Sequence, residues 1–502
     1  MSSSNMSRRD FLWRTSMLAF SSFALLERTG GQDLKFVIAE TSFGKIRGID
    51  NHGIKTFKGI PYGTSTGGTN RFMPPADPAS WTGVRDALEY GHSAPQSAPA
   101  VTHSAPTDPA QAPGPSIYAA LGVSGTKSIG EGEDCLVLNV LGFANFSDFS
   151  PDFSASGDIS MLDIVHALKW VKVNISQFGG DPNTIMIFGQ SGGGRKVETL
   201  LAMPSAKGLF HRATIESGVA IKVVSRDNAI QNAEKLITKL GIPKTEVHKL
   251  QKLPLEFIMA AYFEVVREMG KVDLNVLGFS PTVDGNILPQ HPFHPAASPV
   301  SADVPMMIGC TRMEWTGLVN NDAAAFHLDE DGMQERVKEL LGDKSMDMID
   351  LYRKITPSAT PSDIFFLIAS DYNYGAPTMK IAERRAALGK TPVYLYYFTW
   401  ETPVQGGLLK SPHNLEIPFA FDNILTVKLT GGGPEAMSLA DKVSDTWIAF
   451  ARTGNPNTPK LPHWPEFTAK DRATMVIDNT SKVVSDPLRE QRIAMFSALN
   501  LT

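Results

Sequence analysis

The chain has 502 residues, 42% of them apolar and 20% charged, which is enough for one large α/β domain or for two or three smaller ones. Its 47 basic and 52 acidic residues leave a net charge of -5, too small an excess to gather phosphates, so nucleic acid is not an expected partner. Two cysteines, Cys135 and Cys310, allow at most one disulfide and cannot form a four-thiolate zinc site. Beyond residue 30, no uncharged apolar run reaches the roughly 18 residues that a membrane-spanning helix needs.

Residues 1–31 are predicted to be an export signal. The pair Arg8-Arg9 precedes Phe11-Leu12, and an uncharged, mostly apolar stretch from Thr15 to Leu26 is too short to cross a bilayer. This arrangement resembles a bacterial twin-arginine signal and predicts a periplasmic or secreted protein. A frayed amphipathic helix is the alternative, because no clean Ala-x-Ala cleavage site follows.

The rest of the chain has the pattern of an α/β protein. From Ile159 onward, strand-like runs alternate with helix-like runs, which favours βαβ units and a mostly parallel central sheet flanked by helices. Residues 97–129 are rich in Pro, Ala, Ser and Thr and lack periodicity, so they are predicted to be a long surface loop and not a domain boundary. We therefore expect residues 32–502 to form a single domain.

The sequence contains two matches to the pattern G-x-S-x-G. In a nucleophile elbow of this pattern, the glycines let a strand turn sharply into a helix while the serine stays exposed at the turn. The match centred on Ser191 lies between an apolar run at 184–188 and a stretch of helical composition at 195–203, whereas the match centred on Ser65 lies in a Thr/Gly loop. Ser191 is therefore the candidate nucleophile; a structural serine in a Gly-rich turn is the alternative.

A serine nucleophile needs a histidine as general base, and the base needs a carboxylate that fixes its tautomer. In α/β-hydrolases the chain order is serine, acid, histidine. His413 follows an aromatic strand candidate at 393–400 through a Gly-containing loop, which is where catalytic residues of such sheets lie. His327 and His463 also satisfy the chain order, so position alone does not choose among the three.

The acid candidate is Glu314. It follows a short apolar run at 304–308, read as a buried strand, and so lies just past a strand's carboxyl end. The alternative is a surface carboxylate paired with Arg312, which the spacing also allows.

These segments together resemble the type-B carboxylesterases, a family that includes the cholinesterases and their non-catalytic adhesion relatives. The resemblance covers most of Thr41 to Pro487. The strings that carry it, in chain order, are Phe57-Lys58-Gly59-Ile60-Pro61-Tyr62, Arg71-Phe72, Trp81-Thr82-Gly83, Glu133 to Val140, Asp163 to Val171, Phe178 to Pro182, the Ser191 elbow, Gly208 to Ala213 and Glu216-Ser217-Gly218. The first three look like the family's opening strands.

The resemblance implies an α/β-hydrolase fold and a small-molecule ester as substrate, with no metal or organic cofactor. It implies Ser191 as nucleophile, Glu314 as acid and His413 as base, the last from a His-x-x-Glu motif that ends at Glu416. In the family, the cysteine equivalent to Cys135 has a disulfide partner where this chain has Ala94. A free thiol is therefore predicted at Cys135.

The resemblance is interrupted between Val140 and Leu141. In the family, a strand, a His-Gly-Gly-Gly loop and another strand lie between the Leu-Asn-Val and Leu-Gly-Phe motifs, but here the two motifs are joined directly. That loop supplies most of the backbone amides of the oxyanion hole, so only the amide of Gly192 remains as an identifiable donor. We therefore expect part of the sheet and the oxyanion loop to be deleted near Val140.

Two functions follow from these observations. One is a serine carboxylic ester hydrolase that works through a Ser-His-Glu triad and an acyl-enzyme. The other is a catalytically impaired or non-catalytic cholinesterase-like protein. Retention of all three triad residues favours an esterase over an adhesion protein, whereas the missing loop favours impaired catalysis.

Overall fold

The computed structural model describes residues 35–92, 94, 133, 143–270, 278–319 and 322–501. The predicted export signal, the loop 97–129, Cys135 and the junction between Val140 and Leu141 lie outside these residues. None of the helices in the described part is both long and apolar enough to cross a membrane.

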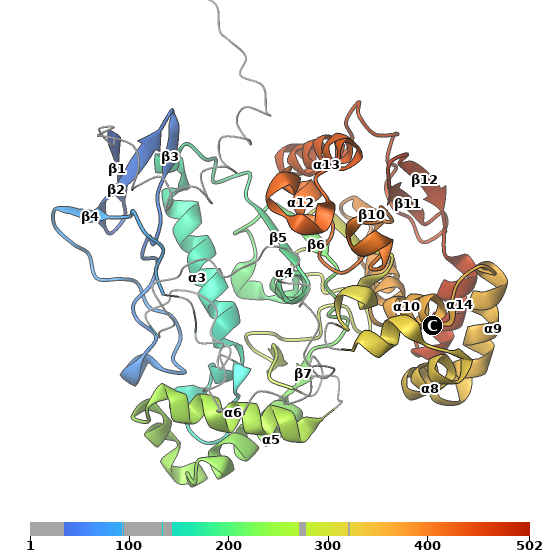
Figure 1. Cartoon of the computed structure of the whole chain (residues 1–502). Helices are drawn as coiled ribbons and strands as arrows, with labels where there is room; N and C mark the ends of the chain where they lie inside the picture. The colour runs from blue at the N-terminus through green and yellow to red at the C-terminus, as the bar shows by residue number, and fades with distance from the viewer. Residues whose placement is uncertain are drawn as a thin grey trace, which may run out of the picture.

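A six-stranded sheet of order β12-β11-β10-β9-β6-β5 forms the centre of the molecule (Figure 1). Its strands are β5 (Met186–Gln190), β6 (Arg212–Glu216), β9 (Met306–Thr311), β10 (Val393–Phe398), β11 (Ala473–Ile477) and β12 (Lys482–Ser485). All neighbouring strands are parallel except β11 and β12, which pair antiparallel. The prediction of a mostly parallel sheet is confirmed.

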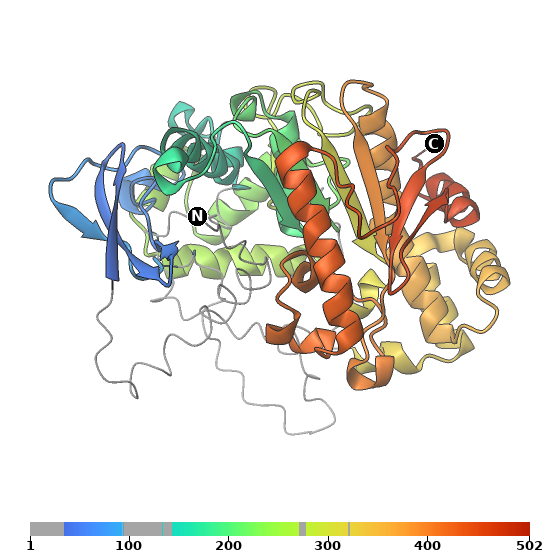
Figure 2. The same cartoon turned by 90° about the horizontal axis from the view of Figure 1, so that it is seen from above.

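Helices cover both faces of this sheet because its central strands are apolar on both sides. Ile308 of β9 points into a core shared with α4 (Gly192–Ala202) and α11 (Ala376–Ala386). Its neighbour Met307 points into a second core shared with α12 (Ile417–Ala420) and α13 (Pro434–Thr453). Figure 2 shows α13 lying along one face of the sheet. Every residue of β9 and β10 is buried, as expected for strands covered on both faces.

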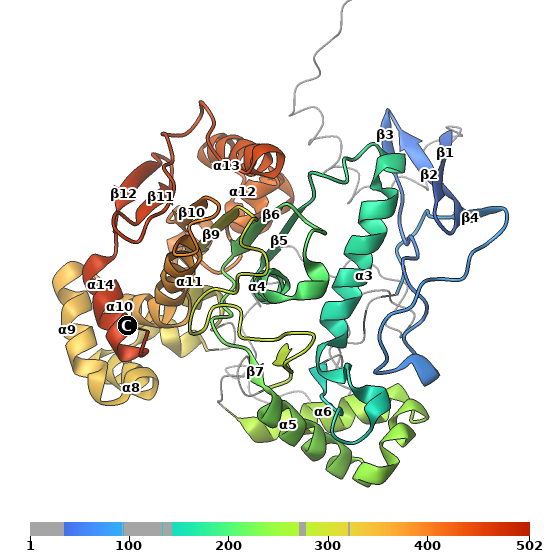
Figure 3. The same cartoon turned by 180° about the vertical axis from the view of Figure 1, so that it is seen from behind.

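Two further helical groups lie at the ends of the sheet. One contains α8 (Glu330–Leu341), α9 (Ser345–Ile355), α10 (Pro361–Ser370) and α14 (Arg489–Ala498), which lie together beside β11 and β12 (Figures 1 and 3). The other contains α5 (Arg226–Lys239) and α6 (Leu255–Met269), next to the two-stranded pair β7 (Val224–Ser225) and β8 (Thr282–Val283).

A small N-terminal sheet lies on the other side of α3 (Ile159–Asn174) from the central sheet (Figures 1 and 3). It contains β1 (Lys35–Thr41), β2 (Gly44–Asn51), β3 (Ile54–Thr56) and β4 (Val84–Asp86), and β2 pairs with the other three.

The reading of the first three family strings as opening strands is wrong. The segments 57–62, 71–72 and 81–83 are irregular connections that follow or precede the strands. Gly59 has φ +65°, and a Cβ there would approach the Glu89 carbonyl to 2.5 Å, while Pro61 lacks a backbone N–H. The strings are sites of tertiary packing: the buried guanidinium of Arg71 bonds the Glu133 carboxylate at 2.6 and 2.8 Å.

Within the described residues, β5 is one of the two edge strands of the central sheet, and one of its apolar side chains, Phe188, is exposed. Phe188 is 46% exposed and lies against Phe421, which is 47% exposed, with ring centroids 5.7 Å apart. An interior strand of a parallel sheet is normally covered on both faces and paired on both edges. The exposure of β5 therefore distinguishes it from β9 and β10.

Candidate active site

Ser191 lies at the sharp turn between β5 and α4. Its backbone has φ 55° and ψ -119°, a strained conformation for a residue with a side chain, and its N–H donates to the Glu216 carbonyl at 2.8 Å. Space requires the first glycine of the motif, because a Cβ on Gly189 would lie 2.4 Å from the backbone of Gly193. A Cβ on Gly193 itself would meet nothing within 4 Å, whereas one on the following Gly194 would lie 2.9 Å from Gly218. The predicted strand-turn-helix setting of Ser191 is confirmed, and Ser65 lies in an irregular segment.

Hydrogen bonds between two loops bring Glu314 and His413 together. Glu314 begins a 3₁₀ turn (Glu314–Gly317) directly after β9, and His413 lies in the connection after β10. The Met313 amide donates to the Ser411 carbonyl at 3.0 Å, and the Thr316 hydroxyl donates to the Leu409 carbonyl at 2.6 Å. The Glu314 carboxylate accepts a hydrogen bond from Nδ1 of His413.

The pairing of Glu314 with Arg312 on the surface, considered from the sequence, is wrong. Glu314 is fully buried and its carboxylate also accepts hydrogen bonds from the Thr311 amide at 2.7 Å and the Ser217 hydroxyl at 2.6 Å. Of the three candidate histidines, His413 is the one whose ring contacts Glu314 in the described structure.

The ring of His413 is held in one tautomer. Because Glu314 accepts the Nδ1 proton, Nε2 carries the lone pair that a general base needs. The Tyr374 ring lies against the imidazole with centroids 5.2 Å apart. The hydrogen bonds among described residues do not include one between the Ser191 hydroxyl and His413; instead, the Gln190 side-chain nitrogen lies 3.1 Å from Nε2 and 3.4 Å from Nδ1.

Ser217 and Glu416 belong to the same buried network, and sequence reasoning assigned neither a role. The Ser217 hydroxyl lies 2.6 Å from Glu314 and 3.2 Å from Glu416. Burial raises the pKa of Glu416 well above its usual value, and the charges of Glu314 and Glu216 raise it further. Since a hydroxyl carries one proton, Ser217 can donate to Glu314 while accepting from a protonated Glu416. The one sequence signal that could have pointed to Ser217 is its position. It directly follows strand β6, and β6 is the neighbour of β9 in the sheet.

A third buried carboxyl, Glu216, accepts a hydrogen bond from the Trp447 indole at 2.7 Å. Burial raises the pKa of Glu216 to about 7, against 4.5 in an exposed chain. A group whose pKa is higher in the folded than in the unfolded protein stabilises the fold in full at pH values below its unfolded-state pKa. This stabilisation is lost as the pH rises through its folded-state pKa.

We therefore expect Glu216→Gln to gain stability relative to the unmodified protein between pH 5 and pH 8, by up to about 3 kcal/mol. The amide keeps an acceptor for Trp447 and cannot ionise. Urea unfolding of both proteins at the two pH values measures the change. Glu335→Gln, at an exposed position of α8, is the matched control and should show no such difference. An equal effect of Glu216→Gln at both pH values would contradict the burial argument.

Gly192, the predicted oxyanion donor, is the first residue of α4. Amides in the first turn of a helix have no acceptor within the helix, and the helix dipole makes that end favourable for negative charge. The first backbone bond of the turn runs from the Arg195 amide to the Ser191 carbonyl at 3.1 Å. The Gly192 amide therefore lies in the first turn of the helix, directly after the serine.

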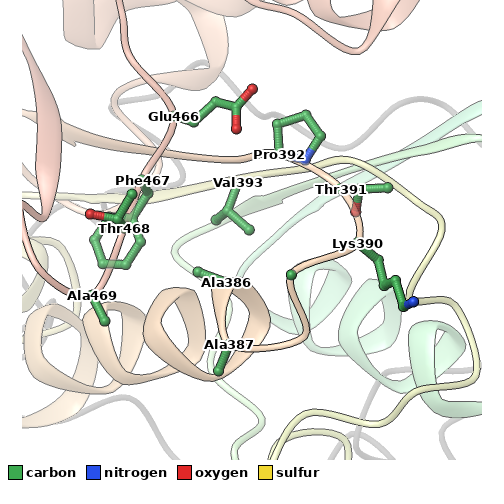
Figure 4. A pocket seen from close by; sticks show the side chains of 11 residues that line it. Ala386, Ala387, Lys390, Thr391, Pro392, Val393, Glu466, Phe467, Thr468 and Ala469 are labelled. Atoms are coloured by element: carbon green, nitrogen blue, oxygen red, sulfur yellow. The ribbon is translucent and has the colours of Figure 1, made fainter.

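The described residues contain no group of three His, Cys, Asp or Glu side chains placed to hold a metal ion. A surface recess lined by Lys390, Val393, Glu466 and Phe467, among others, lies at the start of β10 (Figure 4). His413 follows the opposite, carboxyl end of β10, where catalytic groups of parallel sheets lie.

Comparison with known proteins extends over almost the whole chain. The model of the carboxylesterase family matches residues 35–144 and 138–496, two ranges that share residues 138–144. The para-nitrobenzyl esterase of Bacillus subtilis is 30% identical over 496 aligned positions that span 91% of this chain and 98% of that protein. The phenmedipham hydrolase of Pseudarthrobacter oxydans is 29% identical and is covered to the same extent. Among solved structures, a Geobacillus stearothermophilus carboxylesterase is 31% identical, with a TM-score of 0.73 and coverage of 91% of this chain and 99% of its own.

Proposed function

The chain belongs to the carboxylesterase family, and from this membership we propose that it hydrolyses small carboxylic esters through an acyl-enzyme on Ser191. His413 is the general base and Glu314 the residue that orients it. The observation that carries the proposal is the buried contact between Glu314 and His413 at the carboxyl edge of the sheet, next to a strained serine elbow.

The chemistry proceeds in two halves. In the first, the Ser191 oxygen attacks the ester carbonyl carbon while Nε2 of His413 takes the serine proton, and that proton then leaves with the alcohol. In the second, His413 takes a proton from water, whose oxygen attacks the acyl carbon. The bond to the Ser191 oxygen then breaks, His413 returns the proton to that oxygen, and the acid is released. Glu314 stabilises the imidazolium in both halves, and the Gly192 amide donates to the oxyanion.

The second candidate is an impaired esterase that lacks the strand-loop-strand piece at Val140. The overlap of the two family matches at residues 138–144 favours it, because one short segment fits the family at two separate places. The alignment with the Bacillus subtilis relative has 496 positions but spans 91% of 502 residues, so tens of positions in that relative have no counterpart here. Within the described residues, β5 pairs only with β6, and its Phe188 is 46% exposed.

A fluorophosphonate probe is expected to label Ser191 and no other serine. Of the two candidate serines, Ser191 and Ser65, only Ser191 combines an elbow conformation with a nearby buried histidine-carboxylate pair. Peptide mapping by mass spectrometry after labelling of the purified protein identifies the modified residue. Heat-denatured protein is the control and should remain unlabelled. Labelling at Ser65 would contradict the assignment, and an unlabelled native protein would favour the non-catalytic alternative.

A further inference from the structure

Basic side chains that the ester hydrolysis mechanism does not use gather around Phe293. Phe293 is buried; its amide donates to the Ile221 carbonyl at 3.3 Å, and its carbonyl accepts a hydrogen bond from the Arg384 guanidinium of α11. Lys222 directly follows Ile221, and His294 directly follows Phe293. These two hydrogen bonds therefore join three chain segments and place a basic side chain on each of them.

His291 is the fourth basic residue of this cluster. The Val223 amide donates to its Nδ1 at 3.2 Å, and the ring centroids of His291 and His294 are 5.9 Å apart. Because Nδ1 accepts this hydrogen bond, the proton of the neutral imidazole is on Nε2. His291 can therefore donate a hydrogen bond from Nε2 without carrying a charge.

The positive charge of the cluster has no counter-charge among the described residues. None of the described carboxylates lies within ion-pair distance of its four side chains. Glu383, which precedes Arg384 on α11, lies 2.8 Å from the Lys380 ammonium and 2.8 Å from the Arg472 guanidinium instead. The chain as a whole has a net charge of -5, so the cluster is not a consequence of a basic composition.

The two imidazoles respond to this local positive charge. Burial lowers the pKa of His294, and the charges of Lys222 and Arg384 lower it further. Burial likewise lowers the pKa of His291, together with the charges of His294 and Lys222. Like charges this close destabilise one another, and an anion bound among them would remove the repulsion.

We propose that Lys222, His291, His294 and Arg384 form a binding site for a small tetrahedral dianion, the chemistry shared by sulfate and a phosphate group. Lys222 and Arg384 supply two fixed positive charges, which match the charge of the dianion. The guanidinium has five N–H donors, of which the Phe293 carbonyl accepts one hydrogen bond. Nε2 of His291 donates to the anion, and His294 takes up a proton when the anion binds. The site does not depend on the proposed ester hydrolysis.

Sulfate is the first probe, because it stays a dianion over the pH range in which histidine titrates. The pKa of His294 is measured by NMR from its Cε1–Hε1 signal, in sulfate and in chloride of equal ionic strength. His294→Asn assigns the signal by its loss. An anion beside the ring favours the imidazolium, so sulfate should raise this pKa by about 1 relative to chloride. Equal pKa values in the two salts would overturn the proposal.

Substitutions at Lys222 test whether the sulfate binds among these residues. Lys222→Met should lower the sulfate affinity by about 5-fold or more, because it removes one of the two fixed charges, whereas Lys222→Arg should retain it. Lys222 is exposed, and its side chain makes no hydrogen bond to a described residue, so the fold should be unaffected. Lys207→Met, at another exposed lysine, is the matched control and should bind sulfate as the unmodified protein does. Unchanged sulfate affinity in Lys222→Met also overturns the proposal.

A comparison of inorganic phosphate with phenyl phosphate distinguishes the two sources of the dianion. Both should compete with sulfate for the site in the same His294 measurement. Tighter binding of phenyl phosphate supports a site for a phosphorylated organic molecule, and equal binding supports a site for the free anion. Failure of both to compete contradicts a site built for a tetrahedral dianion.

Discussion

Ser191→Ala is expected to lower kcat for p-nitrophenyl acetate and p-nitrophenyl butyrate by about 10³-fold or more. The substitution removes the oxygen on which the proposed acyl-enzyme forms, and enzymes that lose one member of such a triad retain only what their oxyanion donors and binding contacts supply. The hydroxyl makes no hydrogen bond to another described side chain, so the fold should be unaffected. Steady-state kinetics beside thermal unfolding of both proteins measures the two effects separately.

The same experiment with His413→Ala and with the double variant tests whether the residues act as one unit. A base that works only through Ser191 contributes nothing once the serine is absent, so the double variant should be no slower than Ser191→Ala. Ser65→Ala is the control for the second G-x-S-x-G match and should leave turnover unchanged. Hydrolysis by Ser191→Ala at the unmodified rate would show that another group carries the reaction.

The elbow could be predicted from the sequence because its requirements are local. Gly189 is needed where backbone segments approach too closely for a Cβ, and both the strand before Ser191 and the helix after it are visible in the composition. Prediction of Glu314 at a strand end succeeded for the same reason, since β9 is a short, fully buried apolar run.

The contacts within the site could not be read in this way. Chain order left three histidines equivalent, because the choice of His413 depends on hydrogen bonds between the loops after β9 and β10, such as that from Thr316 to the Leu409 carbonyl. Ser217 reaches Glu314 from the end of a third strand, 97 residues earlier in the chain. The family strings near the N-terminus were misread as strands because they match at positions of packing and turning, such as Gly59.

The largest gain in activity is expected from inserting a family-like strand, His-Gly-Gly-Gly loop and strand between Val140 and Leu141. One oxyanion donor is worth about 10²- to 10³-fold in kcat, so the insertion should raise turnover of p-nitrophenyl esters by at least that factor. It should also raise the soluble yield, because the inserted strands can lie beside β5, whose Phe188 is exposed together with Phe421, the aromatic side chain that lies against it. Turnover and soluble fraction are measured on the same preparations.

A control insertion separates the two effects. It keeps both strands and replaces the His-Gly-Gly-Gly loop with a Gly/Ser linker of equal length, so it can cover β5 without placing the family's donors beside Ser191. Soluble yield should rise with both insertions, whereas kcat should rise only with the family loop, because solubility depends on the sheet edge and turnover on donors aimed at the oxyanion. If the unmodified chain already hydrolyses these esters as fast as the version with the family loop, Gly192 has other donors beside it, and the proposed deletion has no catalytic consequence.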